Sequence, residues 1–350
     1  MYDYPELTQA RNDMLLQDEL YQPTAFWYEA SLKITSELCK YGVDRFRSMQ
    51  MALGFFVPTY GNPGGGFSNE QSDGLRCWLK GKFPNENKSQ LSLNQFLSGY
   101  SWAQADYRVL KASDDSSILP HLHNFSESNV GNPVEQFEFD GCYFSRSSLN
   151  YLLGIAMLKK HLNGEVPRTV LEIGGGFGTL GEVFGNAGIN NLHYIDIDIP
   201  PTSFVAQHYL SEIFGKENVA TYAQMANKET IEIATLPIIA VLCSWQIEKL
   251  QGQVDLFVNF ISFQEMEPHI VKNYLRHVTR LGTRWILLRN MREGKQLKKN
   301  GSVGVDTPIL GDDYLTMLPG YELVDRNIIP FGYQTVDGFN SELLLLRLKE

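Results

Sequence analysis

The spacing of hydrophobic residues indicates a mainly helical first part of the chain. Apolar residues recur every three or four positions across residues 24–41, 43–53 and 144–162, the spacing that gives a helix one buried face. Residues 55–67 contain two prolines and four glycines, which predict a loop rather than a regular element. Residues 68–135 are polar and mixed, and we expect short helices and loops there.

The second part of the chain alternates short apolar runs with helical patterns. This alternation predicts a doubly wound, mostly parallel sheet that binds its ligand at the carboxyl ends of the strands. Two late strands without an obvious helix between them predict an antiparallel pair at one edge. We expect strands at 170–173, 192–197, 238–242, 254–260, 284–288, 321–325 and 342–348, and helices at 179–187, 202–214 and 268–281.

We place a domain boundary in the stretch Asn163–Arg168, N-G-E-V-P-R, which separates the two patterns. The predicted organisation is a mainly helical N-terminal domain, residues 1–165, followed by a ligand-binding sheet domain, residues 166–350. The predicted fold class is therefore α/β, with a Rossmann-like sheet preceded by helices.

The first predicted strand of the sheet ends in a glycine cluster. Residues 169–181 have the sequence T-V-L-E-I-G-G-G-F-G-T-L-G. Glycine permits positive φ at a turn and lets the backbone approach a ligand without a Cβ between them. Two registers fit the cluster. Residues 176–181 match G-x-G-x-x-G, a weak fingerprint of dinucleotide sites, and residues 172–178 match E-x-G-x-G-x-G, which resembles the motif of class I S-adenosylmethionine-dependent methyltransferases.

The acid before the glycines favours the second register. Glu172 stands just before the turn of Gly174, Gly176 and Gly178, where a dinucleotide site usually has an apolar residue. A carboxylate there attracts the ammonium or sulfonium group of S-adenosylmethionine and repels a pyrophosphate. The late antiparallel strand pair also resembles the end of a methyltransferase sheet. We therefore predict S-adenosylmethionine as the cofactor.

Further cofactor contacts are expected where the next strands end. An acid at the end of the second strand would bind both ribose hydroxyls, and we prefer Asp198 to Asp196 because the turn D-I-P-P begins at Asp198. The third strand leads into Ser244 and Trp245. Similar methyltransferases have an acid here for the adenine amine, and this chain has Ser244 instead. Trp245 packs either on the adenine or in the core.

Four more residues belong to the predicted cofactor site. Asn259 and Ser262 follow or end the fourth strand, and Tyr143 and Arg146 precede the sheet domain. Tyr143 and Arg146 would cover the cofactor. Arg146 would pair with the cofactor carboxylate or with a phosphate on the acceptor, and a surface salt bridge is its alternative role.

The composition narrows the class of partner. The 350 residues carry a formal net charge of −10, which argues against a nucleic-acid partner because phosphate binding needs clustered lysines and arginines. The four cysteines include no C-x-x-C pair, and no secretory signal or apolar run of membrane-spanning length is evident. We expect a cytoplasmic protein without a membrane span, and a homo-oligomer remains open.

A set of short segments spread over nearly the whole chain resembles one family. The segments are 23–27 (P-T-A-F-W), 55–61 (F-F-V-P-T-Y-G), 143–146 (Y-F-S-R), 171–178, 198–201, 206–207, 209–210, 259 and 262–266 (S-F-Q-E-M). The family that they resemble is the bacterial sugar O-methyltransferases. The resemblance implies a class I methyltransferase sheet with an antiparallel last strand, and an N-terminal domain that binds the acceptor or acts as a lid. It also implies methylation of a sugar hydroxyl on a glycan, a nucleotide sugar or a glycosylated small molecule, for example in surface polysaccharide synthesis.

Methyl transfer to a sugar hydroxyl needs a base, or a metal that lowers the pKa of the hydroxyl, because the hydroxyl is a poor nucleophile at neutral pH. The segment after the fourth strand usually faces the transferred methyl group. Glu265 in that segment is our first candidate base, and capping of the next helix is its alternative role. His269 is the second candidate. His123, in the loop L-P-H-L-H-N, is the third.

Gln264 and Tyr60 are the predicted acceptor-binding residues; Tyr60 belongs to the aromatic loop of residues 55–67. We assign no metal ligands, because the acids and histidines lack a diagnostic spacing, and a divalent metal stays open. Two other functions also stay open. One is a nicotinamide- or flavin-dependent oxidoreductase that uses the G-x-G-x-x-G loop, and the other is a cofactor-binding protein without catalysis.

Overall fold

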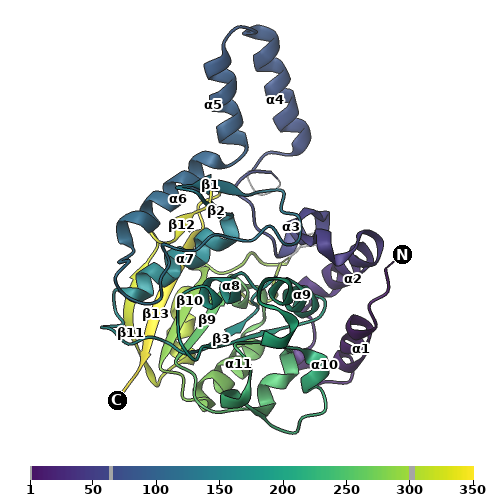
Figure 1. Cartoon of the computed structure of the whole chain (residues 1–350), viewed down its shortest axis with the longest axis vertical. Coiled ribbons are helices and arrows are strands. Elements are labelled where there is room, and N and C mark those ends of the chain that lie inside the picture. Colours follow the sequence, from purple (N-terminus) through teal and green to yellow (C-terminus); the bar gives the residue numbers. More distant parts are fainter. Residues whose placement is uncertain (1, 63–65, 299–303) are drawn as a thin grey trace.

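A large mixed sheet forms where the apolar runs of the second half predicted it (Figure 1). The computed structural model describes residues 2–62, 66–298 and 304–350. The strands lie in the order β5–β7–β4–β3–β9–β10–β13–β11, and β12 pairs with β13. They are β3 (Thr169–Ile173), β4 (His193–Asp198), β5 (Val219–Ala220), β7 (Ile239–Cys243), β9 (Leu256–Phe260), β10 (Trp285–Met291), β11 (Tyr321–Asn327), β12 (Tyr333–Gln334) and β13 (Asn340–Leu348).

The strand directions place a crevice in the middle of the sheet. Strands β5, β7, β4, β3, β9 and β10 are parallel, whereas β13 runs antiparallel between β10 and β11. From β3 the chain first proceeds outward through β4 and β7, and later returns to the other side of β3 with β9 and β10. Ligands of doubly wound sheets bind at the carboxyl ends of the strands, where the strand order reverses.

Helices cover both faces of the sheet, so its central strands are apolar on both sides. Val170, Val258 and Leu287 belong to one buried cluster, and Leu171, Ile195 and Ile286 belong to the other. The first face is covered by α7 (Arg146–Lys159), α8 (Thr179–Gly185) and α9 (Thr202–Phe214), and the second by α1 (Pro5–Met14), α10 (Tyr222–Met225), α11 (Pro268–Arg280) and α12 (Gly311–Met317).

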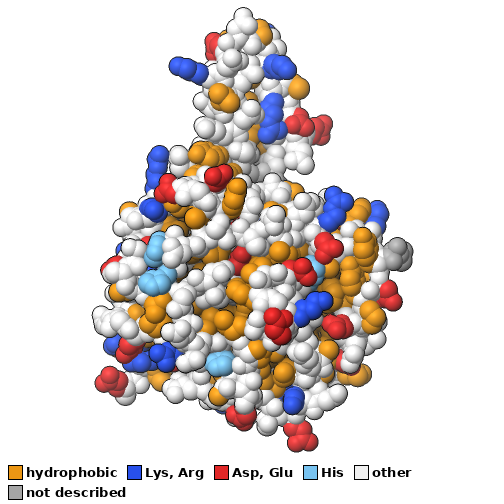
Figure 2. Space-filling view, viewed as in Figure 1, with side chains coloured by type: hydrophobic (Ala, Val, Ile, Leu, Met, Phe, Trp, Pro, Cys, Tyr) orange, Lys and Arg blue, Asp and Glu red, His pale blue; other side chains and the backbone are white. Residues whose placement is uncertain are grey.

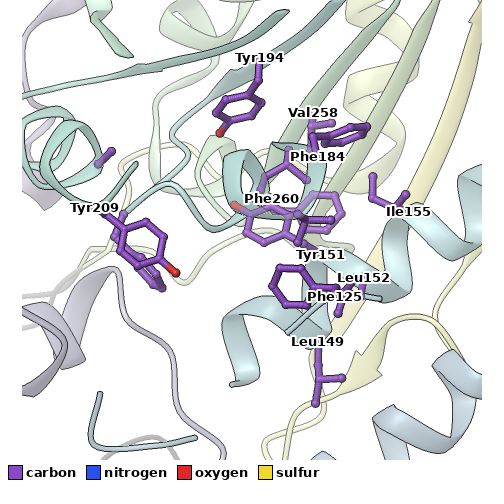
Figure 3. Close-up of a cluster of buried hydrophobic side chains, with 14 of the residues drawn as sticks. Phe125, Leu149, Tyr151, Leu152, Ile155, Phe184, Tyr194, Tyr209, Val258 and Phe260 are labelled. Atoms are coloured by element: carbon purple, nitrogen blue, oxygen red, sulfur yellow. The ribbon is translucent and has the colours of Figure 1, made fainter. Parts of the chain in front are cut away.

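The first cluster includes aromatic side chains from several elements. Tyr151 of α7 stacks on Phe260 at the end of β9, with ring centroids 4.9 Å apart and planes 9° apart (Figure 3). Helix α7 is buried along almost its whole length and packs both on the sheet and on the N-terminal segment, residues 2–145. It therefore joins the two.

The N-terminal segment adds helices and a small hairpin of strands. These are α2 (Ala25–Tyr41), α3 (Gln50–Phe55), α6 (Tyr100–Ser113), β1 (Phe137–Phe139) and β2 (Cys142–Phe144). Between α3 and α6, helices α4 (Asn69–Lys82) and α5 (Asn87–Leu97) form a hairpin that projects from the rest of the molecule (Figure 1). Hydrophobic side chains are visible at the foot of this hairpin (Figure 2).

Short elements complete the described chain. The 3₁₀ helices are η1 (Glu19–Tyr21), η2 (Val43–Ser48), η3 (Lys216–Asn218), η4 (Ile233–Thr235), η5 (Ser244–Lys249) and η6 (Phe263–Glu265), and a small parallel pair consists of β6 (Ile231–Glu232) and β8 (Leu250–Gln251). None of the helices over the described residues has the length and apolar composition needed to cross a bilayer.

The predicted fold class is confirmed: a mostly parallel Rossmann-like sheet with an antiparallel last strand follows a mainly helical segment. Helix α9 has the predicted bounds, and the helix predicted at 43–53 is divided into η2 and α3. Of the loop predicted at 55–67, residues 63–65 lie outside the described residues. The domain boundary at residue 165 stays a prediction.

Candidate functional site

A cleft opens at the carboxyl ends of β3, β4, β7 and β9. Residues of the N-terminal segment form its other wall, so both halves of the chain contribute to it. The lining residues are Leu20, Gln22, Pro23, Thr24, Trp27, Phe55, Phe56, Pro58, Ser147, Asn150, Tyr151, Ile173, Gly174, Gly175, Gly176, Ile197, Asp198, Ile199, Thr202, Ser244, Phe260, Ile261, Ser262, Glu265, Met266, Ile270 and Tyr274.

The glycine turn after β3 supplies backbone to the cleft. Gly174 has φ +73°, a conformation that favours glycine, and a Cβ there would lie 2.0 Å from Oγ of Ser262. A Cβ on Gly175 would lie 2.5 Å from Oδ1 of Asp196 and 2.8 Å from Oε2 of Glu172. The turn therefore needs glycine because the cleft floor is close-packed.

Asp198 ends β4 and faces the cleft. Its Oδ2 accepts the N–H of Gly176 at 3.2 Å, and its Oδ1 accepts the N–H of Ile199 at 2.7 Å. Each carboxylate oxygen can accept a second hydrogen bond, so two acceptor positions remain for a ligand with two hydroxyls. Burial raises the pKa of Asp198 to about 7, against the lowering effect of the two backbone N–H groups.

Glu172 and Asp196 lie below the cleft floor rather than in its lining. They are opposite each other in the β3–β4 register, and both side chains are fully buried. Tyr194 donates a short hydrogen bond to Oε2 of Glu172. The hydroxyl groups of Tyr194 and Tyr151 lower the pKa of this carboxyl group. Burial raises the pKa of Glu172 to about 7 and also raises the pKa of Asp196, and the neighbouring Glu172 raises the pKa of Asp196 further.

This position changes the role that we expect for Glu172. We expected its carboxylate to lie beside the ligand and to attract an ammonium or sulfonium group. The carboxylate lies instead behind Gly175. Residues of a strand alternate between the two faces of the sheet, and Glu172 points to the face that α7 covers. Any negative charge of this carboxyl group acts on the cleft through the glycine turn rather than by contact.

The end of β7 contributes Ser244 to the cleft. Its hydroxyl donates to the carbonyl oxygen of Tyr21 at 2.7 Å, which ties the N-terminal segment to the sheet. Trp245 lies outside the lining, where its ring packs edge-on against Tyr222 with centroids 5.5 Å apart. The position of Trp245 thus agrees with its alternative role in the core and not with packing on an adenine.

The end of β9 holds the cleft wall in an unusual backbone conformation. Ile261 has φ +69°, which is rare for a β-branched residue, and its N–H donates to the carbonyl oxygen of Arg289 at 2.6 Å. Ser262 follows in the lining. Asn259 is buried beneath, where Nδ2 donates to the carbonyl oxygen of Ile173 at 2.8 Å. Asn259 therefore joins two strand ends and lies outside the lining.

Glu265 is the acid on the N-terminal side of the cleft. Its Oε1 lies 2.9 Å from Nζ of Lys295, and its Oε2 accepts the indole N–H of Trp27 at 3.1 Å. Burial raises the pKa of Glu265, and Lys295 and Trp27 oppose this shift. A buried carboxylate with a raised pKa is suited to accept a proton near neutral pH.

The other predicted catalytic residues and the predicted acceptor residue Gln264 are not part of the cleft lining. His269 is exposed on the first turn of α11, and His123 is exposed beside His121, with ring centroids 5.5 Å apart. Gln264 is buried, and its Oε1 accepts the N–H of Met291 at 2.8 Å. The lining contains none of these side chains over the described residues, so their positions do not support direct contact with a ligand.

Tyr60, Tyr143 and Arg146 also lie outside the lining. Tyr143 is exposed on β2. Arg146 donates to the carbonyl oxygen of Thr59 at 2.8 Å and lies over the ring of Tyr60, 5.7 Å from its centroid. The hydroxyl of Tyr60 bonds Asp106. Arg146 therefore supports the loop that follows α3, and Phe56, the first residue of this loop, lines the cleft. Within the described residues Arg146 forms no surface salt bridge.

Several lining residues were not predicted as site residues. Tyr151 and Asn150 come from α7, and Asn150 Oδ1 accepts a hydrogen bond from the buried Arg289 at 2.8 Å. Trp27 and Phe55 come from the N-terminal segment. Both residues lie in segments that carried the family resemblance, 23–27 and 55–61, and that coincidence was the available signal. Nothing in the local pattern of α7 distinguishes a cleft residue from a core residue.

The N-terminus of α8 is covered instead of opening into the cleft. Phe177 packs against Phe46 and Tyr209, with ring centroids 5.4 Å and 5.0 Å away. Oγ1 of Thr179 lies 2.8 Å from Oγ of Ser147, and Thr179 is buried. Dinucleotide sites place a pyrophosphate on an accessible helix N-terminus. This covering disfavours the G-x-G-x-x-G register as a pyrophosphate site.

Within residues 2–62, 66–298 and 304–350, no group of three or more histidine, cysteine, aspartate and glutamate side chains could hold a metal ion. We therefore assign no residue of the cleft to a metal.

Comparisons with known proteins give low similarities. No protein-family model and no curated protein matches the sequence. Among solved structures, the chain is similar to magnesium protoporphyrin IX methyltransferase from Synechocystis, at 14% identity and a TM-score of 0.38 over 58% of this chain and 81% of that one. Mitomycin 7-O-methyltransferase matches at 12% identity and a TM-score of 0.38 over 97% and 76%. A Burkholderia thailandensis 1,6-didemethyltoxoflavin-N1-methyltransferase matches at 16% identity and 0.40 over 57% and 79%.

The strand order of the chain itself defines the fold class. Strand β13 is inserted antiparallel between β10 and β11, and the remaining order reverses at β3, next to the cleft. This is the Rossmann-like sheet of class I methyltransferases.

Proposed function

We propose that this chain is an S-adenosylmethionine-dependent O-methyltransferase that acts on a hydroxyl of a sugar-containing acceptor. The observation that carries the proposal is the pair of acids in one cleft. Asp198 lies at the end of β4 beside the glycine turn, and Glu265 lies at the wall formed with the N-terminal segment. Asp198 is suited to accept hydrogen bonds from ribose hydroxyls, and Glu265 is suited to accept the proton of the acceptor hydroxyl.

The cleft residues fit the chemistry of this cofactor. Gly174, Gly175 and Gly176 bring backbone to the ligand without side chains, and Asp198 has two acceptor positions for the two ribose hydroxyls. Ser244 and Tyr274 line the side of β7 and α11, where the adenine would lie. Glu172 and Asp196 lie below the floor, where ionisation of either carboxyl group would add negative charge near a cationic group.

When bound, S-adenosylmethionine supplies an activated methyl group on a sulfonium centre. The residues of this chain would then align the acceptor and remove its proton. Alignment of two reacting groups is worth up to about 7–11 kcal/mol in well-oriented systems. Glu265 would take the hydroxyl proton as the oxygen–methyl bond forms, a contribution of roughly 10²–10⁴ in rate. Trp27 and Lys295 hold its carboxylate at both oxygens.

Aromatic residues of the cleft lining support the acceptor class. They are Trp27, Phe55, Phe56 and Phe260, and among them the indole of Trp27 contacts the acid Glu265. Aromatic faces suit the apolar faces of sugar rings, and a carboxylate suits their hydroxyls. This supports a sugar acceptor, as the family resemblance implies, and a cytoplasmic reaction in polysaccharide synthesis is part of the proposal.

A methyl-transfer assay tests the proposal. Protein and S-adenosylmethionine labelled in the methyl group are incubated with nucleotide sugars, oligosaccharides, phenols and amines. We expect label in a sugar-containing product, and we expect the rate of labelling to fall at least tenfold with Glu265→Gln. Transfer to amines or phenols alone would overturn the sugar assignment, and no transfer to any acceptor together with no cofactor binding would overturn the enzyme class.

A further inference from the structure

Arg289 of β10 is a buried cation behind the wall of the cleft. It is fully buried, and its guanidinium lies over the ring of Phe260, 5.1 Å from the centroid. Its terminal nitrogens donate to the carbonyl oxygen of Phe331 and, at 2.8 Å, to Oδ1 of Asn150. Its Nε has no hydrogen-bond partner, and no ion pair of the described residues includes Arg289. Buried charges are normally paired because their desolvation is costly, so this cation lacks an expected counter-ion.

The acids around Arg289 do not neutralise it. Burial raises the pKa of Asp106, and Tyr60 and Arg289 lower this pKa by smaller amounts. The hydrogen bond that Oδ2 of Asp106 accepts comes from the hydroxyl of Tyr60 and not from an arginine. Glu265, the acid on the cleft wall, has its own partner in Lys295 at 2.9 Å. The positive charge of Arg289 is therefore available to a ligand.

Arg289 fixes the orientation of the Asn150 amide. A guanidinium only donates hydrogen bonds, so the atom of Asn150 that faces it must be the oxygen. The Nδ2 group then points away from Arg289, and its two N–H groups donate to no residue within the described ranges. Asn150 lines the cleft, and its Nδ2 is not among the atoms that are buried without a partner. The amide therefore presents its donors to the cleft.

Asn150 lies across the glycine turn from the position proposed for the ribose. Its neighbour Tyr151 also lines the cleft and stacks on Phe260 at the end of β9 (Figure 3). Arg289, which bonds Asn150, belongs to β10, the strand beyond β9. Asp198 ends β4, on the other side of β3. Asn150 therefore faces the part of the cleft that is left for the sugar acceptor.

A neutral donor in front of a buried cation suits an anionic group. A carboxylate bound to Nδ2 of Asn150 would be separated from the guanidinium by one amide group and two hydrogen bonds of about 2.9 Å each. Attraction over that separation is strong where water is excluded. A neutral hydroxyl would also accept from Nδ2, but it would leave Arg289 without a negative partner. Phosphate is usually bound by a guanidinium fork or by several N–H groups, whereas one amide is present here. The arrangement thus favours a carboxylate.

We propose that Asn150 binds a carboxylate of the sugar acceptor, with Arg289 as the positioning residue behind it, so that the acceptor is a hexuronate rather than a neutral hexose. This inference rests on the proposed function and adds the class of sugar. The acceptor would then be held at two walls of the cleft, by its carboxylate on α7 and by its reacting hydroxyl at Glu265. Two contacts of this kind align the hydroxyl for transfer.

Matched pairs of methyl glycosides test the class of sugar, because a hexuronate differs from its hexose only at C6. The gluco, galacto and manno pairs, and the corresponding hexose 6-phosphates, are supplied as acceptors with S-adenosylmethionine. We expect kcat/KM for the hexuronate of the best pair to exceed that for its hexose at least about tenfold.

The outcomes separate this inference from the proposed function. A hexose or a hexose 6-phosphate that reacts as well as the hexuronate would overturn the inference and leave the proposed methyl transfer intact. Absence of transfer to all of these glycosides, with S-adenosylhomocysteine still bound, would also overturn the inference. Absence of both transfer and binding of S-adenosylhomocysteine would overturn the proposed function as well.

Substitution of Asn150 tests the residue itself. In Asn150→Asp the new carboxylate would pair with Arg289, remove the donor and repel an acidic acceptor. We expect the ratio of kcat/KM for hexuronate over hexose to fall at least about tenfold, and the affinity for S-adenosylhomocysteine to change less than about threefold. Asn150→Ala removes the donor alone, so the ratio should fall by less.

The matched control is Asn87→Asp, which adds the same charge at an exposed position on the first turn of α5. It should leave the ratio unchanged. If Asn150→Asp and Asn150→Ala both bind S-adenosylhomocysteine and both keep the wild-type ratio, Asn150 does not bind the carboxylate and the inference is overturned.

Discussion

The indole N–H of Trp27 donates to Oε2 of Glu265 across 3.1 Å, and this bond joins helix α2 to the segment after β9. The hydroxyl of Thr24 donates to the carbonyl oxygen of the same glutamate at 3.3 Å. Trp27 and Glu265, which are 238 positions apart in the chain, thus line one cleft. The first half of the chain positions the acid that the second half supplies, and catalysis should depend on both.

Replacing the proposed base should remove turnover and spare cofactor binding. Glu265→Gln keeps the shape of the side chain and its acceptor oxygen for Trp27, but it cannot take a proton. We expect kcat to fall at least tenfold, because a positioned base contributes roughly 10²–10⁴ in rate. The affinity for S-adenosylhomocysteine, measured by calorimetry, should change less than about threefold. Unchanged turnover would remove Glu265 as the base.

The bond from Trp27 should be visible in the pH dependence of kcat. The hydrogen bond from Trp27 and the charge of Lys295 both lower the pKa of Glu265 against the effect of burial. Trp27→Phe removes the N–H, so the pKa of Glu265 should rise and the acidic limb of the kcat profile should move to higher pH. Lys295→Met should move it in the same direction. If Trp27→Phe lowers kcat uniformly across the pH range, the residue has a structural role alone.

Asp198 should control the affinity for the cofactor. Asp198→Asn replaces one acceptor oxygen by a donor that faces a backbone N–H, so we expect the dissociation constant of S-adenosylhomocysteine to rise about 100-fold. In the wild type the pKa of Asp198 is raised to about 7. The ionised carboxylate is the form that accepts ribose hydroxyls, so affinity should fall as the pH decreases below 7, and Asp198→Asn should lose this dependence.

The matched control for this experiment is Asp196→Asn. Asp196 lies behind Gly175 and outside the lining, so its replacement should change the affinity much less than Asp198→Asn does. A larger effect of Asp196→Asn would show that the ligand contacts the other acid of β4.

The buried Glu172 should destabilise the protein at high pH. Its pKa is raised from 4.5 to about 7, so its favourable contribution is fully present below about pH 4.5 and is lost as the pH rises through 7. Glu172→Gln should leave the free energy of unfolding almost unchanged at pH 4 and raise it by about 1–3 kcal/mol at pH 8. Urea unfolding at both pH values measures this. Equal effects at the two pH values would contradict this prediction.

Much of the sheet could be predicted because its strands are short apolar runs between clear turns. Helix α9, residues 202–214, was predicted at its exact bounds. The position of β13 between β10 and β11 could not be predicted, because strand order depends on contacts between distant segments. The α4–α5 hairpin was expected only as short helices, since its few apolar residues give no sign of where it points.

The candidate site was predicted only in part. Asp198 and Glu265 are in the cleft, because carboxyl ends of parallel strands meet at one edge of a sheet. Glu172 was expected at the ligand and lies beneath the turn, since an acid in a strand can face either layer of helices. Trp27 and Asn150 were missed as site residues, because α2 and α7 reach the cleft through tertiary packing alone.

Binding of S-adenosylhomocysteine to the wild-type chain tests the central claim most directly. Thermal unfolding is followed with S-adenosylhomocysteine, NAD or FAD, because a ligand that binds the folded state raises stability by about 2.7 kcal/mol at 100 times its dissociation constant. We expect S-adenosylhomocysteine to raise the midpoint of the wild type, with a smaller shift for Asp198→Asn. Stabilisation by NAD or FAD, without any by S-adenosylhomocysteine, would contradict the proposed methyltransferase.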